Sequence, residues 1–368
     1  MPADDPRDTG GIGGIGGIGV LRERIDAIDA QMLELLNERA RCASEIGHLK
    51  GGAVVYRPER EAQVLRRLGD LNTGPLPAAA VNHLFVEIIS ACRALERQMR
   101  VAYLGPRGTY SEDAVGKQFG AQADLDPCAS IAEVFRHVES GAAGYGMVPT
   151  ENSTEGGIGT TLDLLLATRL RICGEVQLPI HHCLLSKLPA AAEIESIYAH
   201  AQSLGQCNSW LAQHAPNAAR VPVASNAEAA RRAALEPRSG AIASQGAARL
   251  YGVPVIAENI EDEADNTTRF LVIADQDVAP SGRDKTTFVM SARNRPGGLN
   301  EVLGPIAAHG VSMSRLESRP SRTGLWEYVF FVDVEGHQSD SAVAAALTAV
   351  RERAAFLKIL GSYPIARA

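Results

Sequence analysis

Apolar residues recur along residues 20–100 at alternating steps of three and four, which is the spacing of one face of an α-helix. The first series covers 21–49, and Gly51-Gly52 ends it. A second helix is predicted over 58–71, beginning with a proline that suits a first helical turn, and a third over 81–99. Three helices expose more apolar surface than they bury among themselves, so we expect this segment to dimerise.

Beyond residue 100 the pattern changes to short β-type runs that alternate with helical stretches, as far as about residue 275. This alternation is typical of an α/β fold. Its length suits two lobes with a cleft between them, and such clefts bind ligands. The predicted strands are Val101–Leu104, Tyr145–Val148, Gly174–Leu178, His182–Leu185, Ile197–Ala199, Gly240–Ala243 and Phe270–Ile273.

Residues 277–285 contain Pro280, Ser281 and Gly282 and are predicted to form a linker. The segment after them has the order βαββαβ, which is that of a ferredoxin-like α+β domain. The predicted elements are Thr286–Ala292, Leu299–His309, Ser312–Ser318, Trp326–Val334, Ser341–Ala354 and Phe356–Leu360.

Composition supports a multidomain cytoplasmic protein. A chain of 368 residues fits two or three domains. The net charge of -7 argues against nucleic-acid binding, and no apolar run approaches the ~20 residues that span a membrane. Residues 1–19 include GGIGGIGGIG and are predicted to be a disordered tail, not a signal peptide. The six cysteines are scattered and fit reduced thiols, with no metal site.

Charges interrupt the apolar face of the first helix. Arg39 stands where the pattern expects an apolar residue, and Lys50 is three turns further on the same face. On the predicted third helix, Glu96 follows Cys92 by four residues. Because a buried guanidinium without a counter-charge costs several kcal/mol, two interpretations stay open. The charges form internal ion pairs or are exposed to solvent, or they line a pocket for an anionic ligand between helices.

The stretches LRERIDAID, LLNERARCASEIGHLK and YRPEREAQVL resemble the all-helical chorismate mutases. The resemblance implies that Arg22 and Arg39 hold substrate carboxylates, with Arg22 reaching the partner subunit's site. Lys50 would donate to the ether oxygen and Glu61 would hold the ring hydroxyl. The active-site positions that it implies are Arg22, Arg39, Lys50, Arg60, Glu61, Cys92 and Glu96.

One departure from that family carries a prediction. Glu96 stands where some members have Gln, whose amide donates a hydrogen bond at any pH. A carboxyl group donates only while it is protonated. We therefore expect mutase activity to fall as the pH rises.

The middle segment resembles prephenate dehydratases through AYLGPRGTYSEDA, VPTENSTEGGIGTTLDLL, HHCLL, YAHAQSLGQC and NTTRF. The resemblance implies two lobes like those of periplasmic ligand-binding proteins. It implies Thr268 as donor to the departing hydroxyl and Arg269 as carboxylate anchor. The other implied pocket residues are Asn152, Ser153 and Thr154, with His181, Gln206 and Ser244 as weaker candidates and Glu151 as an alternative acid. Adjacent His181 and His182 face opposite ways on a strand, which argues against a metal site there.

The last 80 or so residues resemble an ACT domain of the type joined to these dehydratases, through RPGGLNEVL and SRLESRP. Such domains pair side by side with an amino acid between them, which implies phenylalanine as effector. Gly298 and Asn300 depart from the usual Ala and Val. The implied effector-binding residues are Gly297, Gly298, Leu299, Asn300, Glu317, Ser318 and Arg319.

Together these resemblances imply a fused chorismate mutase (20–100) and prephenate dehydratase (101–277) with an ACT domain (285–364). The expected reactions lead from chorismate through prephenate to phenylpyruvate, with no cofactor, in a homodimer or dimer of dimers. Two alternatives stay open. The chain is a non-enzymatic sensor of aromatic amino acids, or its dehydratase acts on arogenate.

Overall fold

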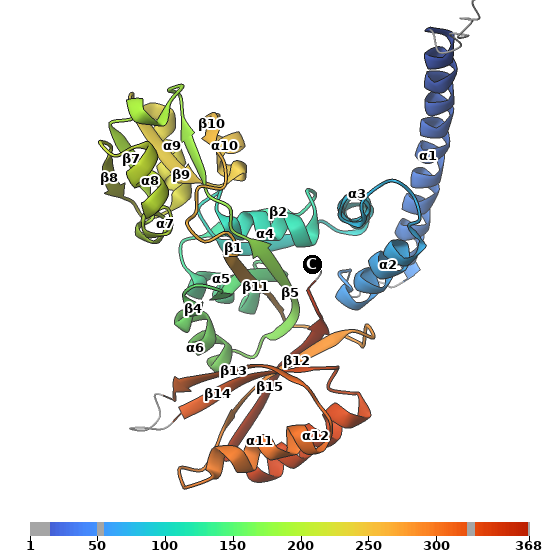
Figure 1. The fold of residues 1–368 in the computed structure, drawn as a ribbon. Helices are drawn as coiled ribbons and strands as arrows, with labels where there is room; N and C mark the ends of the chain where they lie inside the picture. Colours follow the sequence, from blue (N-terminus) through green and yellow to red (C-terminus); the bar gives the residue numbers. More distant parts are fainter. Residues whose placement is uncertain (1–14, 50–54, 322–327, 367–368) are drawn as a thin grey trace, which may run out of the picture.

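The computed structural model describes residues 15–49, 55–321 and 328–366, which form three parts in chain order (Figure 1). The helical domain comprises α1 (Ile15–Leu49), α2 (Pro58–Leu71) and α3 (Ala78–Glu96). Helix α1 begins at Ile15, so residues 15–19 are helical although they were predicted to belong to a disordered tail. Helix α3 ends at Glu96, earlier than predicted, and Met99 is buried in the core of the next domain.

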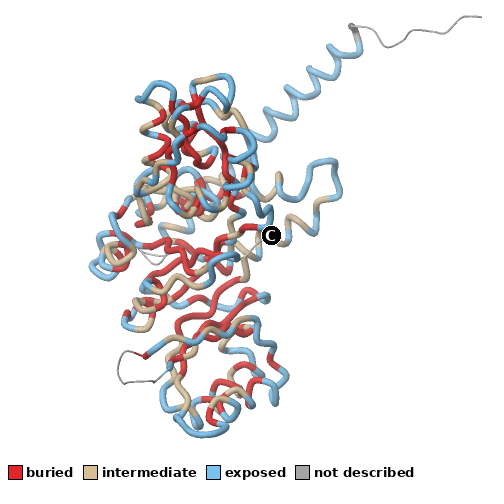
Figure 2. The backbone as a smooth tube through the Cα atoms, turned by 60° about the vertical axis from the view of Figure 1, so that its left-hand side comes forward, coloured by how far each residue is buried: buried red, intermediate tan, exposed pale blue. Residues whose placement is uncertain are grey.

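Helix α1 projects from the rest of the chain and is exposed along most of its length (Figures 1 and 2). It packs on α3 only near its C-terminal end. Its large exposed apolar residues are Ile18, Val20, Leu21, Ile25, Ile28, Met32, Leu33, Leu35, Leu36, Ile46 and Leu49. Such a continuous apolar surface is typical of a helix that another chain covers.

Helix α3 is long and apolar enough to span a membrane by length and composition alone. Its Val86, Ile89 and Cys92 are buried, and its buried Arg93 donates to Glu61 of α2 at 2.5 Å. It also contacts α1, α2 and α4 (Tyr110–Phe119). These contacts explain its apolar character as that of a packing helix.

The two-lobed domain contains two sheets with a lobe around each. The first sheet has the order β2-β1-β3-β11-β5, and β4 (Gly156–Gly157) pairs with β3. Its strands are β1 (Arg100–Leu104), β2 (Asp124–Cys128), β3 (Tyr145–Asn152), β5 (Arg171–Pro179) and β11 (Thr267–Ala274). Its helices are α4, α5 (Ile131–Glu139) and α6 (Gly159–Ala167).

The second lobe has the strand order β10-β6-β9-β7-β8. Its strands are β6 (Cys183–Ser186), β7 (Ser196–Ala199), β8 (Ala219–Pro222), β9 (Ser239–Ala243) and β10 (Val255–Ala257). Its helices are α7 (Ala201–Gln206), α8 (Asn208–His214), α9 (Asn226–Leu235) and α10 (Gln245–Tyr251). The chain returns to the first lobe through β11. All seven predicted strands are present, whereas β2, β4, β8 and β10 were not predicted.

The C-terminal domain confirms the predicted βαββαβ order. Its sheet has the order β13-β14-β12-β15, and α11 and α12 lie on one face of it (Figure 1). The elements are β12 (Asp284–Ser291), α11 (Gly298–Ala308), β13 (Met313–Pro320), β14 (Tyr328–Glu335), α12 (Ser341–Arg353) and β15 (Phe356–Pro364).

The C-terminal domain docks firmly on the first lobe. Strand β15 runs against β5 so closely that a Cβ at Gly361 would lie 2.1 Å from the Ile172 carbonyl oxygen. The Lys358 ammonium donates to the carbonyl oxygens of Leu165 (3.0 Å) and Leu166 (2.9 Å) and so satisfies free carbonyls at the end of α6. The two domains therefore share a packed interface.

The predicted linker is part of this packing, which corrects the sequence interpretation. The Asp284 carboxylate accepts from the backbone amides of Ser281 (2.8 Å) and Gly282 (3.0 Å), and Asp284 and Ser281 are buried. Arg66 of α2 donates to the Ser281 carbonyl oxygen at 3.2 Å. Its Pro, Ser and Gly residues form a fixed turn between three domains.

Tyr56 joins the helical domain to the two-lobed domain. It is fully buried between Phe119 and Tyr145, with ring centroids at 4.9 and 5.1 Å. Its hydroxyl accepts from Gln118 at 2.5 Å, and the Arg93 guanidinium lies 5.4 Å from its ring centroid. One aromatic side chain from the N-terminal segment thus completes a core in the next domain.

We predict that Tyr56→Ala lowers the stability of the two-lobed domain by ~3–5 kcal/mol, as large-to-small core substitutions do. Tyr56→Phe keeps the ring and loses one hydrogen bond, so a loss of ~1 kcal/mol is expected. Urea midpoints followed by far-UV circular dichroism measure both. Equal midpoints for Tyr56→Ala and the wild-type chain would contradict the assignment.

Candidate active sites

A cleft of about 1020 Å³ lies between the two lobes. Both lobes contribute to it, because its walls include the end of β3 and the start of β11 in the first lobe and the starts of helices from each lobe. The polar lining residues include Thr109, Tyr110, Asn152, His182, Ser203, Gln206, Ser225, Asn226, Ser244, Asn266 and Thr268. The cleft contains four of the predicted site residues, namely Asn152, Gln206, Ser244 and Thr268.

Thr268 and Asn152 meet in the cleft from neighbouring strands. Their backbones are paired in register across β11 and β3. The Asn152 amide donates to the Thr268 hydroxyl oxygen at 2.9 Å and to the Asn266 side chain at 2.8 Å. Because the hydroxyl oxygen already accepts a hydrogen bond, the proton of Thr268 is free to point at a ligand.

Tyr110, His182 and Gln206 form a chain of hydrogen bonds that links the lobes across the cleft. The Tyr110 hydroxyl lies 2.9 Å from His182 Nδ1, and His182 Nε2 lies 2.9 Å from Gln206 Oε1. Burial lowers the pKa of His182, so the ring stays neutral near pH 7, and burial raises the pKa of Tyr110. Within the described residues, Gln206 Nε2 is buried without a partner, which suits a donor to a ligand.

Helix N-termini from both lobes point at the cleft. Thr109 caps the start of α4, and Ser225 caps the start of α9, where its side chain accepts from the Glu228 amide. Helix N-termini carry partial positive charge and free N–H groups, which favour anions. The only Arg or Lys of the described lining, Arg232, already pairs with Glu228 at 3.2 Å. The cleft therefore suits a carboxylate held by backbone amides and hydroxyls.

Several predicted cleft residues lie elsewhere. Ser153 and Thr154 shape the turn after β3: Ser153 Oγ bonds across to the Thr267 amide at 2.9 Å, and Thr154 Oγ1 donates to Asn152 at 2.6 Å. Neither lines the cleft. His181 is exposed and bonds to Glu261, whereas its neighbour His182, which was not singled out, enters the cleft. Gln206 and Ser244 do line it.

Arg269 is the largest correction. Successive residues of a strand face opposite sides, so Thr268 faces the cleft and Arg269 faces the C-terminal domain. There the buried guanidinium donates to Asp333 (2.6 Å), Glu175 (2.8 Å) and the Tyr363 hydroxyl (2.9 Å). It cannot anchor a ligand carboxylate in the cleft. Glu151, the alternative acid, also lies on that side and pairs with Arg315 at 3.0 Å.

The helical domain brings three predicted residues together between α1 and α3. Arg39 Nη1 donates to Cys92 Sγ at 2.9 Å. Glu96, one turn further along α3, lies against α1, where a Cβ at Gly47 would be 2.7 Å from its Cγ. Lys50 lies outside the described residues. The Arg39 guanidinium, the Cys92 thiol and the Glu96 carboxyl thus lie together in the groove between α1 and α3.

Arg22 does not reach this groove within one chain. It is exposed on the projecting part of α1, ~26 Å along the helix axis from Arg39 at 1.5 Å per residue. Arg60 is exposed on α2. Glu61 accepts from Arg93, which also donates to the Phe119 carbonyl oxygen at 2.7 Å. The role of Glu61 toward a substrate hydroxyl stays a prediction.

The predicted effector residues fall into two groups on the C-terminal domain. Gly297, which directly precedes α11, has φ 76° and therefore favours glycine. A Cβ at Gly298 would lie 2.3 Å from the Arg293 carbonyl oxygen, so the usual Ala would require a shift of this backbone. Leu299 lines an adjacent cavity of about 680 Å³ with Tyr328, Phe330 and Phe356, and Asn300 is exposed.

The second group lies on β13, an edge strand of the sheet. Glu317 and Arg319 point at the first lobe, where Arg319 pairs with Asp163 at 3.1 Å, and Ser318 is exposed. Among the described residues of one chain, Leu299 lines the cavity of about 680 Å³, whereas Glu317, Ser318 and Arg319 do not.

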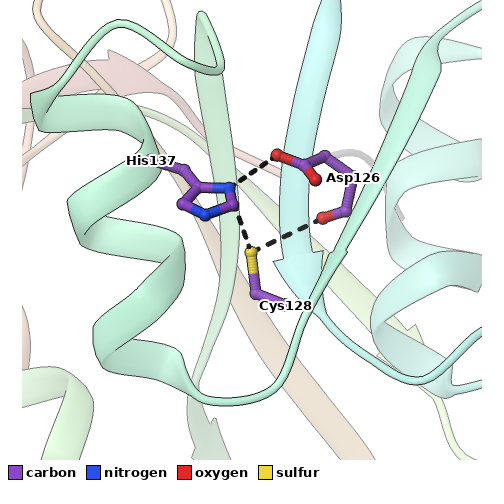
Figure 3. Close-up of side chains that lie close together, drawn as sticks. All are labelled: Asp126, Cys128 and His137. Carbon is purple, nitrogen blue, oxygen red and sulfur yellow. Dashed lines mark hydrogen bonds and ion pairs between the residues drawn. The ribbon is translucent and has the colours of Figure 1, made fainter.

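Asp126, Cys128 and His137 converge between β2 and α5 (Figure 3). His137 Nδ1 lies 2.7 Å from Asp126 Oδ2 and 3.6 Å from Cys128 Sγ. Burial, with Asp126 and Glu133 nearby, raises the pKa of the Cys128 thiol to about 11. A protonated thiol is a poor metal ligand, and the His–Asp hydrogen bond accounts for the other two side chains.

Comparison with known proteins identifies all three parts. The family model for chorismate mutase type II matches residues 21–97, that for prephenate dehydratase 101–278, and that for the ACT domain 286–352. A bifunctional chorismate mutase/prephenate dehydratase of Neisseria gonorrhoeae is 52% identical over 94% of this chain and 96% of its own. One from Stutzerimonas stutzeri is 50% identical over 93% and 96%.

The chain belongs to the bifunctional chorismate mutase/prephenate dehydratases.

A solved structure agrees with the architecture of the dehydratase and ACT domains. Prephenate dehydratase of Arthrobacter aurescens, in complex with L-Phe, has a TM-score of 0.67 and 36% identity, over 72% of this chain and 90% of its own. The multidomain fold predicted from the sequence is confirmed, as is its enzyme class. The dehydratase cleft and the mutase groove described above therefore belong to domains of known activity.

We predict that Thr268→Ala lowers dehydratase kcat by ~10²–10³-fold, which is typical for loss of one donor at developing charge. Thr268→Ser keeps the hydroxyl and should retain most of the rate. Initial rates of phenylpyruvate formation from prephenate measure both, and mutase rates of the same preparations control for folding. A near-normal rate for Thr268→Ala would remove this residue from the mechanism.

Proposed function

We propose that this chain, as a cytoplasmic homodimer or dimer of dimers, carries out both steps from chorismate to phenylpyruvate and is inhibited by phenylalanine. Its parts are then a mutase over 20–100, a dehydratase over 101–277 and an effector domain over 285–364. The observation that carries the proposal is the hydrogen-bonded pair Asn152–Thr268 in an anion-binding cleft, in a chain that also brings Arg39, Cys92 and Glu96 together.

In the dehydratase cleft, the two helix N-termini would hold the prephenate carboxylates, with Gln206 as a further donor. The Thr268 hydroxyl would donate a hydrogen bond to the departing ring hydroxyl. As the C–O bond breaks, the bond to the ring carboxylate breaks with it and its electrons complete the aromatic ring. The leaving oxygen departs as hydroxide and takes a proton from solvent, so the products are water, carbon dioxide and phenylpyruvate. A threonine hydroxyl is too weak an acid to give up its proton fully, so it stabilises the charge of the leaving oxygen.

In the mutase groove, the reaction needs a compact conformation of a dianion and stabilisation of charge on its ether oxygen. Arg39 would bind one carboxylate, and Lys50 and Glu96 would donate to the ether oxygen. Arg22 would complete the site of a second chain. The exposed apolar face of α1 supports this pairing, since a second copy would cover that face and carry its Arg22 along.

The ACT domain would bind phenylalanine between two copies. Strand β15 is covered by β5, whereas β13 is the other edge of the sheet, so pairing through β13 brings the two groups of effector residues from different chains together. The apolar cavity beside Leu299 would receive the benzyl group.

One assay tests the proposed function. The purified chain, supplied with chorismate alone, should produce prephenate and then phenylpyruvate, and phenylalanine should lower the second rate. Turnover of arogenate measured beside prephenate decides between the two dehydratase substrates, with prephenate expected to be preferred. A chain that binds phenylalanine and turns over neither substrate would be a sensor, and the proposal would be wrong.

Substitutions test the role of Glu96. The amide of Glu96→Gln can donate a hydrogen bond to the ether oxygen, so this variant should keep or raise mutase kcat/KM. Glu96→Ala removes the donor and should lower mutase kcat/KM by ~10²-fold. Initial rates of prephenate formation from chorismate measure both, with dehydratase rates as the control for folding. A wild-type rate for Glu96→Ala would show that Glu96 does not donate to the ether oxygen.

Dimerisation through α1 is tested by Ile28→Asp together with Leu35→Asp. Both residues lie on the exposed apolar face, and a charge there disfavours burial by a partner. Light scattering should show a smaller species, and mutase activity should fall by at least ~10-fold because Arg22 no longer reaches its partner site. Unchanged size and activity would contradict pairing through this helix.

A further inference from the structure

The first lobe and the ACT domain meet at a buried group of charges directly behind the cleft. Arg269 is about 8% exposed and Glu175 about 4%. The Glu175 carboxylate also accepts from Lys285 at 2.9 and 3.0 Å and from the Ala366 amide at 2.9 Å. Burial alone would lower the pKa of Arg269, but Tyr363, Asp333 and Glu175 outweigh it and raise the pKa. Arg269, Glu175 and Asp333 are therefore each held by several partners, and these include residues of both domains.

These charges alternate with the cleft residues along the same two strands. Thr268 pairs in register with Asn152 across β11 and β3, and Arg269 pairs with Glu151. The first pair faces the cleft, and the second pair faces the ACT domain. Each cleft residue therefore has a backbone neighbour whose side chain the ACT domain binds.

Two strands of the ACT sheet supply the charged partners of Arg269 and Glu151, and β15 adds the Tyr363 hydroxyl, which accepts from Arg269 at 2.9 Å. Asp333 of β14 binds Arg269 at 2.6 Å, and its own second oxygen accepts from Thr287 at 2.6 Å, so it is fixed in place. Arg315 of β13 pairs with Glu151 at 3.0 Å and also with Glu317. The ACT sheet thus binds β3 and β11, the two strands of the cleft wall, through ion pairs.

The same face of β13 also contacts the β3–β4 hairpin, which lines the cleft. A Cβ at Gly157 would lie 2.1 Å from the Glu317 carboxylate, and Gly157 lines the cleft. Gly157 in turn pairs with Glu151 across β4 and β3. A shift of β13 by a fraction of an ångström would therefore reach the cleft wall through direct contacts.

We propose that Glu151 and Arg269 are positioning residues for the dehydration: the ACT sheet binds their side chains and thereby fixes Asn152 and Thr268 at the reacting end of the cleft. This inference rests on the proposed dehydratase function and adds to it a direct mechanical link from the ACT domain. The link predicts a specific kinetic signature. When these ion pairs are weakened, the Thr268 hydroxyl leaves its position, and a displacement of ~1 Å can lower the rate ~10²-fold. Substrate binding by the helix N-termini is kept.

The test compares Asp333→Asn, Arg269→Gln and the double variant Arg269→Gln/Asp333→Asn in the full chain. Each single change leaves a buried charge with one partner fewer, so the unfolding midpoint should fall. The double change removes both charges and should recover much of the lost stability. If the pair only stabilises the fold, dehydratase activity should recover with stability. If it positions the cleft wall, kcat for prephenate should stay at least ~10-fold low while KM stays within ~3-fold of the wild-type value.

The chain offers controls for folding and for the effect of removing an unrelated charge. Mutase activity of each preparation should stay within ~2-fold of wild type, because α1 and α3 hold that groove. Arg238→Gln removes an exposed ion pair of the other lobe, with Glu195 at 2.8 Å, and should leave the dehydratase unchanged. Arg315→Gln removes the ion pairs with Glu151 and Glu317 and leaves the partners of Arg269 in place. It should lower kcat by a smaller factor with unchanged KM, which gives a reading even where the double variant fails to fold.

Wild-type turnover of prephenate tests the proposed function, and the ratio of variant to wild-type kcat tests this inference, so the two failures are distinguishable. Wild-type kcat in the folded double variant, or in Arg315→Gln when the double variant does not fold, would overturn the positioning role. A parallel rise in KM would also overturn it, since that result assigns the charges to substrate binding.

Discussion

The buried guanidinium of Arg269 is the interaction on which this architecture depends. An unpaired charge at that depth would cost several kcal/mol, and its partners come from β5, β14 and β15. The two-lobed domain therefore needs the ACT domain to complete its own interior. The ACT domain in turn relies on the same residues to bury Asp333 and Tyr363. If the two domains were separated, each would expose charged or polar side chains that are buried in the interface.

The helical domain is attached by the same principle with different chemistry. Tyr56 supplies an aromatic ring to the core of the two-lobed domain, and Arg93 bonds to the Phe119 carbonyl oxygen. Helices α2 and α3 are therefore fixed to the dehydratase, while most of α1 is left exposed. This division separates the part of the mutase that belongs to the chain from the part that a second chain would complete.

Periodicity alone predicted much of the fold, because each part has a clear repeat. The three helices, seven strands of the two-lobed domain and the βαββαβ order follow from spacings of about 3.6 and 2 residues. Strands β2 and β8 were missed because proline and charged residues obscure their alternation: Asp124–Cys128 reads DLDPC and Ala219–Pro222 reads ARVP. The linker was misassigned because Pro, Ser and Gly form tight buried turns as readily as open ones.

The candidate sites were less predictable from sequence. Thr268, Asn152, Gln206 and Ser244 do line the cleft, but adjacent residues of a motif were assigned together although a strand sends them to opposite sides. Thr268 and Arg269 are the clearest case, and His181 and His182 are another. Alternation could have separated Arg269 from Thr268. No local signal could have shown that Asp333, 64 residues later, binds Arg269.

The ACT domain fixes β3 and β11, the cleft-wall strands, from the side opposite the cleft. Amide hydrogen exchange along β3 and β11, compared between the wild-type chain and Asp333→Asn without substrate, tests it most directly. The account predicts faster exchange concentrated at residues 149–152 and 267–271, with β7 and β9 of the other lobe unchanged. Unaltered exchange in β3 and β11, or an equal increase in both lobes, would contradict it.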